Sequence, residues 1–287
     1  MQTAQLGSNG PVVTRLGFGA MHLSLAGRPS EADGERTLHA VFDAGVTLID
    51  TANAYCIDDS DIGHNERLIA RALASWRGDR ERILVATKGG LRRPRGEWPT
   101  DGRPSALREA CEASLRALGR QVIDVYQLHA PDSKVPFTDS VGALARLREE
   151  GKIRHVGLSN VNVAEIEQAR AIVPIVSVQN RFGPMSRDSE RNGVIAHCAK
   201  QNIAFLPFGP FGGSRKAKAL AELGTLGKTA ASYGVSPHRL VIAWILAKYP
   251  GLFPIPGSTR REAILDLVAA DSMRLTPDDI QRIDASF

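Results

Sequence analysis

Length and composition place this chain among large globular proteins. It has 287 residues, 43% of them hydrophobic, which suits one domain with a sizeable core. It contains no run of about 18 apolar residues and no signal-peptide pattern, so we expect neither membrane insertion nor export. Cys56, Cys111 and Cys198 are far apart and lack Cys-x-x-Cys spacing, so the sequence predicts no disulfide framework. We therefore expect a protein of the reducing cytoplasm.

The positive charge of the chain does not by itself identify a partner. A formal net charge of +5 is compatible with nucleic acid, a membrane surface or a phosphorylated ligand. Most basic residues are mixed with Asp and Glu, and they cluster only at 92–95 and 260–261. The sequence has no nucleic-acid-binding signature and no metal motif such as His-Glu-x-x-His. It therefore predicts no nucleic-acid partner and no metal.

Predicted strands and helices alternate along the chain. The opening AQLGSNGPVV carries an Asn9-Gly10 turn signal and predicts a hairpin. Short β-rich runs follow at 16–21, 46–50, 82–88, 122–129, 152–160, 175–180, 202–209 and 252–258. Amphipathic segments such as 105–119, 137–151 and 236–251 lie between them and predict crossover helices.

Eight strand candidates in series predict a single (β/α)8 TIM barrel over residues 1–287, with the N-terminal hairpin closing one end. An open doubly wound sheet is the alternative. Its nucleotide-binding form needs Gly-x-Gly-x-x-Gly after a strand, and Gly17-Phe-Gly19 is only a fragment of that motif.

Polar residues recur where the predicted strands end. These residues are Asp50, Lys88, His129, Ser159, Asn160, Gln179, Asn180, Gly257 and Ser258. In a barrel these ends share one rim, where barrel enzymes place their active sites. Each residue alone also fits a solvated side chain or a cap, so the constellation is more informative than its members. Tyr55 follows Asp50 closely enough for a short turn to return its phenol over the rim.

A set of phrases along the chain resembles the aldo-keto reductases. They are LGFGAM, GVTLIDTANAY, GHNE, ILVATK, IDVYQLH, GKIRHVGLSN, VQNRF, IAFLPFG and IPGS, in this order. The resemblance implies a (β/α)8 barrel that binds NADP(H) without a Rossmann fold and acts on a small carbonyl substrate. It further implies a catalytic tetrad of Asp50, Tyr55, Lys88 and His129, and family precedent favours a monomer. VQNRF and LPFGPFGG resemble the bacterial branch whose members reduce pyridoxal.

The chemistry of this tetrad follows from its residue types. Carbonyl reduction needs a hydride at carbon and a proton at oxygen, and an unperturbed phenol, with a pKa of about 10, is a weak acid. A Lys88 ammonium nearby is expected to lower the pKa of Tyr55, while Asp50 holds Lys88 in place. His129 is expected to orient the carbonyl oxygen. We therefore predict Tyr55 as the general acid of reduction.

The resemblance also assigns cofactor contacts. Ser159, Asn160 and Gln179 match positions that bind the nicotinamide carboxamide, and Phe205 matches the aromatic residue that stacks on the nicotinamide. The segment from Leu206 to Gly213 is expected to bring its backbone close to the pyrophosphate. The predicted cofactor-binding residues in full are Gly19, Met21, Asp50, Ser159, Asn160, Gln179, Phe205, Leu206, Pro207, Phe208, Gly209, Gly212, Ile255, Gly257, Ser258, Arg260, Arg261 and Asp266.

The segment IPGSTRRE resembles the family's adenosine-phosphate segment. Ser258 precedes a helix whose N-terminal N–H groups favour an anion, and Arg260 or Arg261 suits a 2′-phosphate. The sequence therefore favours NADPH over NADH. Ala263 and Leu267 stand where many relatives carry Arg and Asn, although Asp266 suits its position.

The substrate pocket and two alternative functions remain open. Candidates for the pocket wall are Met21, His22, Trp98, Phe182 and Phe211. The long basic loop 89–103 is compatible with covering the substrate or attracting an anionic one, but its composition favours a solvated surface loop. One alternative is a lyase that uses Lys88 as a Schiff base. The other is an NADP(H)-binding sensor or scaffold with little catalysis. Cys56 is interpreted as a small packing residue rather than a redox-sensitive one.

Overall fold

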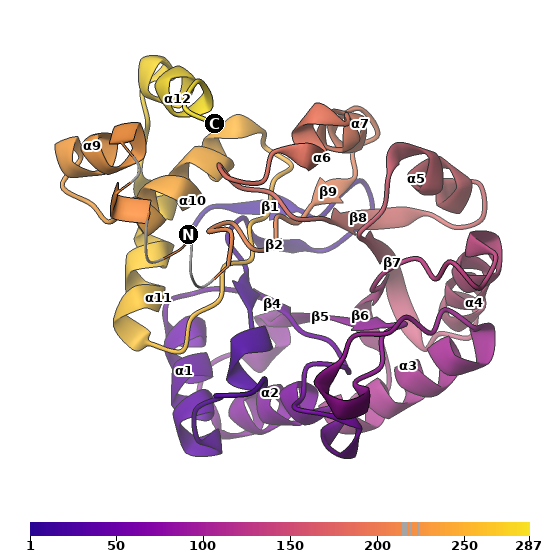
Figure 1. Cartoon of the computed structure of the whole chain (residues 1–287). Helices are drawn as coiled ribbons and strands as arrows, with labels where there is room; N and C mark the ends of the chain where they lie inside the picture. Colours follow the sequence, from indigo (N-terminus) through magenta and orange to yellow (C-terminus); the bar gives the residue numbers. More distant parts are fainter. Residues whose placement is uncertain (214–216, 218–219, 223) are drawn as a thin grey trace.

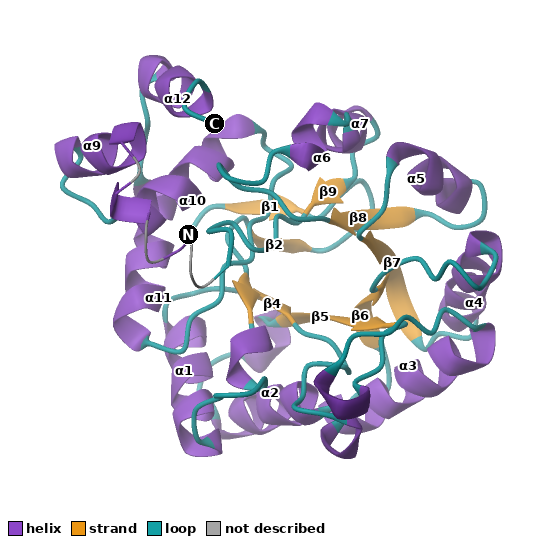
Figure 2. Ribbon diagram, in the orientation of Figure 1, coloured by secondary structure: helices purple, strands orange, loops and turns teal. Residues whose placement is uncertain are grey.

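A ring of parallel strands surrounded by helices makes up the protein, as Figures 1 and 2 show. The computed structural model describes residues 1–213, 217, 220–222 and 224–287. Each strand pairs in parallel with the next in chain order, which confirms the predicted barrel. The strands are β3 (Phe18–Gly19), β4 (Leu48–Asp50), β5 (Leu84–Gly89), β6 (Ile123–Leu128), β7 (Ile153–Ser159), β8 (Ile175–Gln179) and β9 (Ala204–Phe205).

The predicted eighth strand, 252–258, closes the ring without forming a regular strand. On one side Phe253 N–H donates to the carbonyl of Phe205 at 2.8 Å, and on the other Gly17 N–H donates to the carbonyl of Pro254 at 2.9 Å. Pro254 and Pro256 have no N–H to return toward β3. Half of the backbone hydrogen bonds that would join this segment to β3 are therefore missing. The segment nevertheless occupies the place of the eighth strand in the barrel.

The N-terminal hairpin covers the amino-terminal end of the barrel. Its strands β1 (Thr3–Gln5) and β2 (Val12–Thr14) are antiparallel, as predicted. Leu6 and Val13 pack with inward-facing side chains of β4 and β5, Leu48 and Leu84. This end is thus filled by apolar side chains, which leaves the carboxyl end of the strands for polar groups.

Helices form the outer layer and bury their apolar faces against the strands. Predicted helices 105–119, 137–151 and 236–251 are present with ends shifted by up to three residues. The α-helices are α1 (Glu31–Asp43), α2 (His64–Ser75), α3 (Pro104–Leu118), α4 (Phe137–Glu149), α5 (Val163–Arg170), α6 (Asp188–Arg191), α7 (Val194–Lys200), α9 (Gly224–Ser232), α10 (Pro237–Lys248), α11 (Arg261–Val268) and α12 (Pro277–Asp284).

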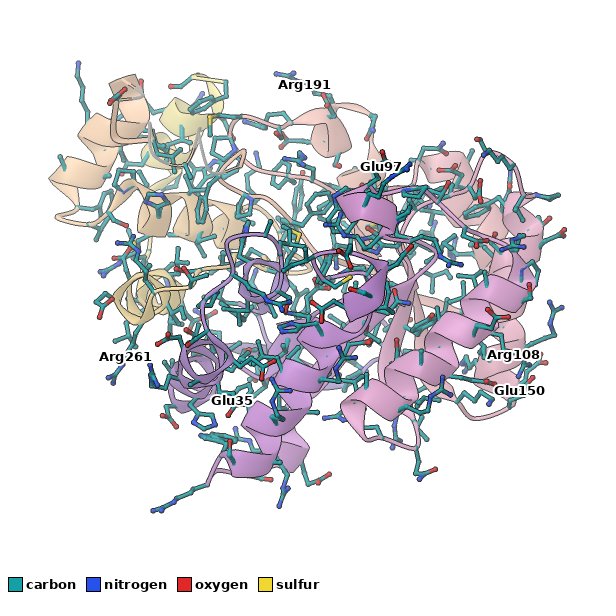
Figure 3. The ribbon with its side chains drawn as sticks, turned by 60° about the horizontal axis from the view of Figure 1, so that its bottom comes forward. Glu35, Glu97, Arg108, Glu150, Arg191 and Arg261 are labelled. Atoms are coloured by element: carbon teal, nitrogen blue, oxygen red, sulfur yellow. The ribbon has the colours of Figure 1, made fainter. Side chains whose placement is uncertain are left out.

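Ion pairs lie on the outer surface of this helical layer. Arg108 of α3 and Glu150, the residue after α4, lie side by side and are hydrogen-bonded, with Arg108 Nη1 2.8 Å from Glu150 Oε2 (Figure 3). Such an exposed pair adds little to stability, because water screens both charges. Among the described residues, no helix combines the length and the apolar character that crossing a bilayer requires.

Candidate active site

The four predicted tetrad residues meet at the carboxyl end of the barrel. Asp50 is the last residue of β4, Lys88 lies near the end of β5, and His129 directly follows β6. Tyr55 lies in the turn after β4, and its ring centroid is 5.7 Å from that of His129. All four side chains are buried, Lys88 completely. The structure therefore brings together residues that span almost 80 positions of the sequence.

Lys88 is the centre of this cluster. Its Nζ donates to Asp50 Oδ2 at 2.7 Å, to the Thr51 carbonyl at 2.8 Å and to the Tyr55 hydroxyl at 3.1 Å. An ammonium group has three N–H donors, and here each has one acceptor. The Lys88 side chain is thus held in a single position beside the phenol.

The second carboxylate oxygen of Asp50 is bound by two glutamines. Gln179 Nε2 donates to Asp50 Oδ1 at 2.7 Å, and Gln127 Nε2 does so at 3.3 Å. Gln179 was predicted to bind a cofactor, which stays a prediction, and its amide N–H is bonded to Asp50. Gln127 was not predicted, although it lies two residues before His129 and therefore points to the same side of β6. Together the two amides keep Asp50 facing Lys88.

Burial and nearby charge have opposite effects on the pKa of Lys88, and likewise on that of Tyr55, and both pKa values end above their usual values. Burial alone lowers the pKa of Lys88, but the Asp50 carboxylate and the Tyr55 phenol outweigh it and raise that pKa above its usual value. Burial raises the pKa of Tyr55, and the nearby Lys88 charge only partly opposes it. Lys88 does lower the pKa of Tyr55, as expected, but desolvation of the phenolate is the larger cause and makes the net shift upward. Tyr55 is protonated at neutral pH.

His129 is neutral in this site. Burial, and then the Lys88 charge, hold its pKa well below 6.5. Its backbone carbonyl accepts a hydrogen bond from Asn160 Nδ2 at 2.9 Å, which fixes the segment after β6 to the segment after β7. A neutral imidazole carries one N–H donor and one acceptor, so it is able to hydrogen-bond a polar group without adding charge.

Ser159 and Asn160 extend the polar rim beyond His129. Ser159 is buried at the end of β7 and its Oγ accepts from Asn160 Nδ2 at 3.1 Å. Asn160 is exposed and has φ of 59°, a left-handed conformation that Asn tolerates better than most residues. Its side-chain oxygen has no hydrogen-bond partner among the described residues. An acceptor is therefore presented at the barrel mouth.

Comparison with known proteins assigns the chain to a family. The model of the aldo/keto reductase family matches residues 15–286. The chain belongs to the aldo/keto reductase family. It is 35% identical, over 95% of its length and 86% of the relative, to an uncharacterized oxidoreductase of Schizosaccharomyces pombe.

Solved structures share its fold. A thermostable aldo-keto reductase crystallised with the inhibitor epalrestat aligns over all of both chains, with a TM-score of 0.85 and 27% identity. An aldo/keto reductase from Klebsiella pneumoniae, solved with NADP and acetate, aligns over 99% of this chain and 95% of its own, with a TM-score of 0.82 and 24% identity.

The predicted aromatic partner of the nicotinamide in this aldo/keto reductase is not at the barrel mouth. Phe205 is 1% exposed and lies in the outer apolar layer, where its ring centroid is 6.4 Å from that of Phe182. Phe182, predicted for the pocket wall, stacks on Trp244 in the same layer, so this placement was also wrong. Phe208 instead packs against the inner cluster, because residues 204, 206 and 208 alternate inward.

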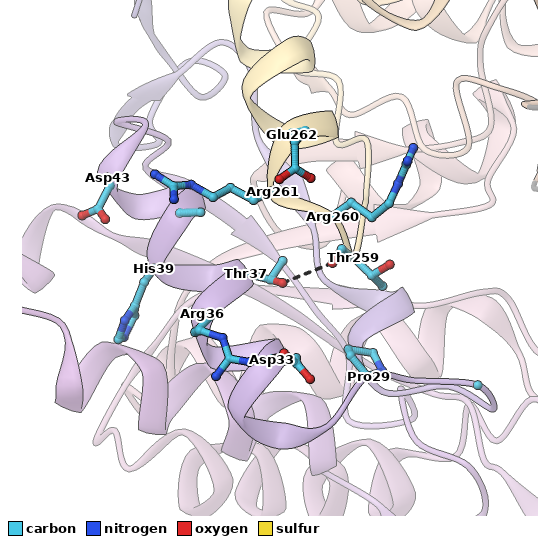
Figure 4. A pocket seen from close by; sticks show the side chains of 12 residues that line it. Pro29, Asp33, Arg36, Thr37, His39, Asp43, Thr259, Arg260, Arg261 and Glu262 are labelled. Carbon is cyan, nitrogen blue, oxygen red and sulfur yellow. Dashed lines mark hydrogen bonds and ion pairs between the residues drawn. The ribbon is translucent and has the colours of Figure 1, made fainter.

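The predicted phosphate end lies between α1 and α11. A groove of about 630 Å³ is lined there by both helices, and Arg260 and Arg261 extend in opposite directions from the start of α11 (Figure 4). Ser258 Oγ accepts the backbone N–H of Arg260 at 3.1 Å, and both arginines are exposed. Asp266, predicted to bind the cofactor, is held by Arg239 of α10 at 2.7 Å. Its carboxylate therefore joins two helices rather than facing this groove.

The remaining predicted cofactor residues lie in or directly after β3, in the segment after β9 and in the closing segment 252–258. Gly19 pairs with Asp50 in the sheet, and Met21 follows in the turn beyond it. A Cβ on Gly257 would lie 2.4 Å from the Gly19 carbonyl oxygen, so the two segments cross in close contact. Ile255, Leu206 and Pro207 are buried, whereas Gly209 and Gly212 have positive φ. No metal-binding group of three or more His, Cys, Asp or Glu is present in the part of the chain that the structure describes.

Proposed function

We propose that this aldo/keto reductase reduces an aldehyde or ketone to the alcohol with NADPH, and catalyses the reverse oxidation. The observation that carries the proposal is the chain of contacts from Asp50 through Lys88 to Tyr55, with Nζ 2.7 Å from the carboxylate and 3.1 Å from the phenol oxygen. A buried phenol beside a fixed ammonium suits proton transfer to a carbonyl oxygen.

Tyr55 supplies the proton in this mechanism. Burial keeps the phenol protonated at neutral pH, which is the form that reduction requires. As the proton leaves, the phenolate forms next to the Lys88 ammonium, which is already in position and stabilises the new charge. Asp50 compensates the buried charge of Lys88 and keeps it from moving. In alcohol oxidation the same phenolate accepts the proton.

His129 orients the carbonyl oxygen toward Tyr55. The two rings are in edge-to-face contact with centroids 5.7 Å apart, so one carbonyl oxygen beside them is close to the polar atoms of both side chains. The neutral imidazole donates a hydrogen bond to that oxygen without competing with Lys88 for the phenolate.

The residues at the mouth fit NADPH. Bound NADPH supplies the hydride that reduces the carbonyl carbon. The free side-chain oxygen of Asn160 suits the amide N–H of a carboxamide, and Ser159 lies beside it. Phe208, rather than Phe205, offers an aromatic face at this mouth. Exposed Arg260 and Arg261 offer the charge that a 2′-phosphate needs, which favours NADPH over NADH.

The test is NADPH oxidation at 340 nm with 4-nitrobenzaldehyde, pyridoxal and phenanthrenequinone. Tyr55→Phe is expected to lower kcat by at least about 100-fold while the protein still binds NADPH. Tyr249→Phe is the matched control, because Tyr249 follows α10 and no hydrogen bond of its hydroxyl is found among the described residues. Near-normal turnover by Tyr55→Phe would refute the role of Tyr55.

The Schiff-base alternative fits this site poorly. Every N–H of Lys88 has an acceptor, and its raised pKa keeps the amine protonated and therefore not nucleophilic. A sensor or scaffold without turnover is the second candidate, and NADPH binding with no reduction of any carbonyl would favour it.

Pyridoxal is our candidate for the physiological substrate, since a basic loop beside the mouth suits a polar aldehyde. We propose further that residues 1–287 act as one domain and as a monomer, which analytical ultracentrifugation with and without NADPH would test.

A further inference from the structure

The loop between β5 and α3 folds into a compact hairpin beside Tyr55. Leu91 and Thr100 form an antiparallel bridge at its base, and Arg92 N–H donates to the Pro99 carbonyl at 3.0 Å. At its tip Pro94–Gly96 forms a turn of 3-10 helix. The loop therefore has a defined shape, which its sequence pattern did not reveal.

Arg93 joins this hairpin to the turn that follows Tyr55. Its guanidinium donates to the carbonyls of Cys56 and Ile57, each at 3.2 Å, and to those of Gly96 and Glu97, at 2.5 and 3.2 Å. The side chain is buried, with 5% of the residue exposed. No carboxylate of the described residues forms an ion pair with this guanidinium, so its donors serve only main-chain oxygens and hold the two loops together.

Trp98 lies between Arg93 and Tyr55. The guanidinium carbon of Arg93 is 3.7 Å from the centre of the Trp98 ring, a cation–π contact that is strengthened by burial of the charge. The ring meets Tyr55 edge to face, with centroids 6.3 Å apart and an interplanar angle of 81°. Trp98 nevertheless remains 41% exposed.

Trp98 exposes apolar indole surface directly beside the phenol proposed as the proton donor, which distinguishes it from an ordinary surface residue. Burying its free area against a ligand is favourable, and a flat apolar ring is the shape that matches an indole best. A tryptophan side chain in a loop is free to change its rotamer. Here the Arg93 guanidinium stacks on the indole and restricts the rotamers of Trp98. Trp98 is thus already in place before any ligand binds.

From this arrangement we infer that Trp98 is a substrate-binding residue selective for carbonyl compounds that carry a planar ring, and that Arg93 is the residue that positions it. The inference rests on the proposed reductase function. Arg93 affects substrate binding through Trp98, whereas Trp98 contacts the ring of the substrate beside the phenol.

Steady-state kinetics with an aryl and an alkyl aldehyde test both roles. For Trp98→Ala we expect KM for 4-nitrobenzaldehyde to rise about tenfold, KM for butanal to change less than about twofold, and kcat to hold within about threefold. Trp98→Phe keeps a planar ring and is expected to recover most of the aryl preference. Arg93→Met should repeat the Trp98→Ala pattern. Arg93→Lys should do so in part, because an ammonium has three donors for four carbonyls and no planar face to stack on the indole.

Two comparisons separate positioning from a merely structural role. The double variant Arg93→Met with Trp98→Ala is expected to be no worse for the aryl aldehyde than Trp98→Ala alone, since Arg93 acts through Trp98. Arg92→Met is the matched control, because Arg92 is the exposed neighbour with only a 3.6 Å contact to Asp101. Additive losses in the double variant, or equal losses for aryl and alkyl aldehydes, would overturn the inference while leaving the reductase function intact. If Arg93→Met does not fold, Arg93→Lys and the two Trp98 variants still decide the question.

A binding measurement keeps the inference testable even if no aldehyde is turned over. Calorimetric titration of the NADPH complex with 4-nitrobenzyl alcohol forms a complex that has no hydride acceptor and therefore cannot react. We expect the dissociation constant to rise about tenfold in Trp98→Ala, with 1-butanol unaffected. An inactive wild-type protein that shows this difference would refute the reductase proposal alone. Aryl binding that does not depend on Trp98, or no aryl binding at all, would refute the role of Trp98.

Discussion

Glu66 is a buried acid close to Lys88, and its protonation is expected to make the stability of the protein depend on pH. It lies in the first turn of α2 with no exposed surface, and Thr87 Oγ1 donates to its Oε1 at 2.6 Å. Its other oxygen, Oε2, has no hydrogen-bond partner among the described residues. Burial raises the pKa of Glu66 to about 7, although the Thr87 hydrogen bond partly opposes this.

The sign and the size of the effect follow from that pKa. In the unfolded chain the carboxyl ionises near pH 4.5, so between pH 4.5 and about 7 the folded protein keeps a proton that the unfolded chain releases. The free energy of unfolding therefore falls as pH rises through this range and stays low above it. The difference in pKa corresponds to about 3 kcal/mol, an upper value because the buried carboxylate is able to draw in water.

Glu66→Gln removes this titration with little change in volume. We expect the variant to gain up to about 3 kcal/mol over the wild type at pH 8 and to match it at pH 4.5. Urea unfolding at pH 4.5, 6, 7 and 8 measures the difference. Glu109→Gln, which alters an exposed glutamate of α3, is the control and is expected to leave the pH dependence unchanged. The same pH dependence in Glu66→Gln and the wild type would refute the reasoning.

Three further predictions concern the site itself. Lys88→Met is expected to lower kcat at least about 100-fold and to destabilise the protein by about 3–5 kcal/mol, since it leaves Asp50 buried without a cation; kinetics and urea unfolding check both. His129 is expected to stay neutral at pH 6, and an NMR titration in which its ring gains a proton near pH 6.5 would contradict the burial argument. Gly257→Ala, which crowds the Gly19 carbonyl, is expected to cost about 1–3 kcal/mol in thermal unfolding, whereas Gly251→Ala, with open space around its Cβ, is the control.

The convergence of the tetrad was predictable because barrel topology is repetitive. Once eight strand candidates were recognised, the ends of all strands had to share one rim, so Asp50, Lys88 and His129 were placed together without any knowledge of side-chain geometry. The chemical roles of these residues stay predictions until turnover is measured. Gln127 was missed because an amide within a strand carries no signal of its own. The two-residue periodicity of β6 was nevertheless sufficient to place it on the same side as His129.

Contacts between irregular loops could not be predicted from the sequence. Arg93 looked like one member of a solvated basic cluster, because nothing in the pattern of residues shows that four carbonyls of two loops converge on one guanidinium. The direction of the net shift in the pKa of Tyr55 was equally unpredictable from the sequence. The sequence revealed the nearby positive charge, but the competing cost of burial depends on packing that only the folded structure defines.

The alternation of side chains along a strand corrects the assignment of the aromatic ring at the barrel mouth that was made from the family resemblance. Matching the phrase IAFLPFG by its letters assigned the ring to Phe205, but a strand sends successive side chains to opposite faces. Ala204 and Leu206 fill the inner cluster, so Phe205 must face the helices, and the same alternation returns Phe208 to the interior. Because Phe208 lies at the carboxyl end of this segment, it is the phenylalanine able to reach a ligand above Asp50 and Lys88. Phe208→Ala is thus the substitution that should weaken NADPH binding, whereas Phe205→Ala should act mainly on stability by leaving a cavity beside Phe182.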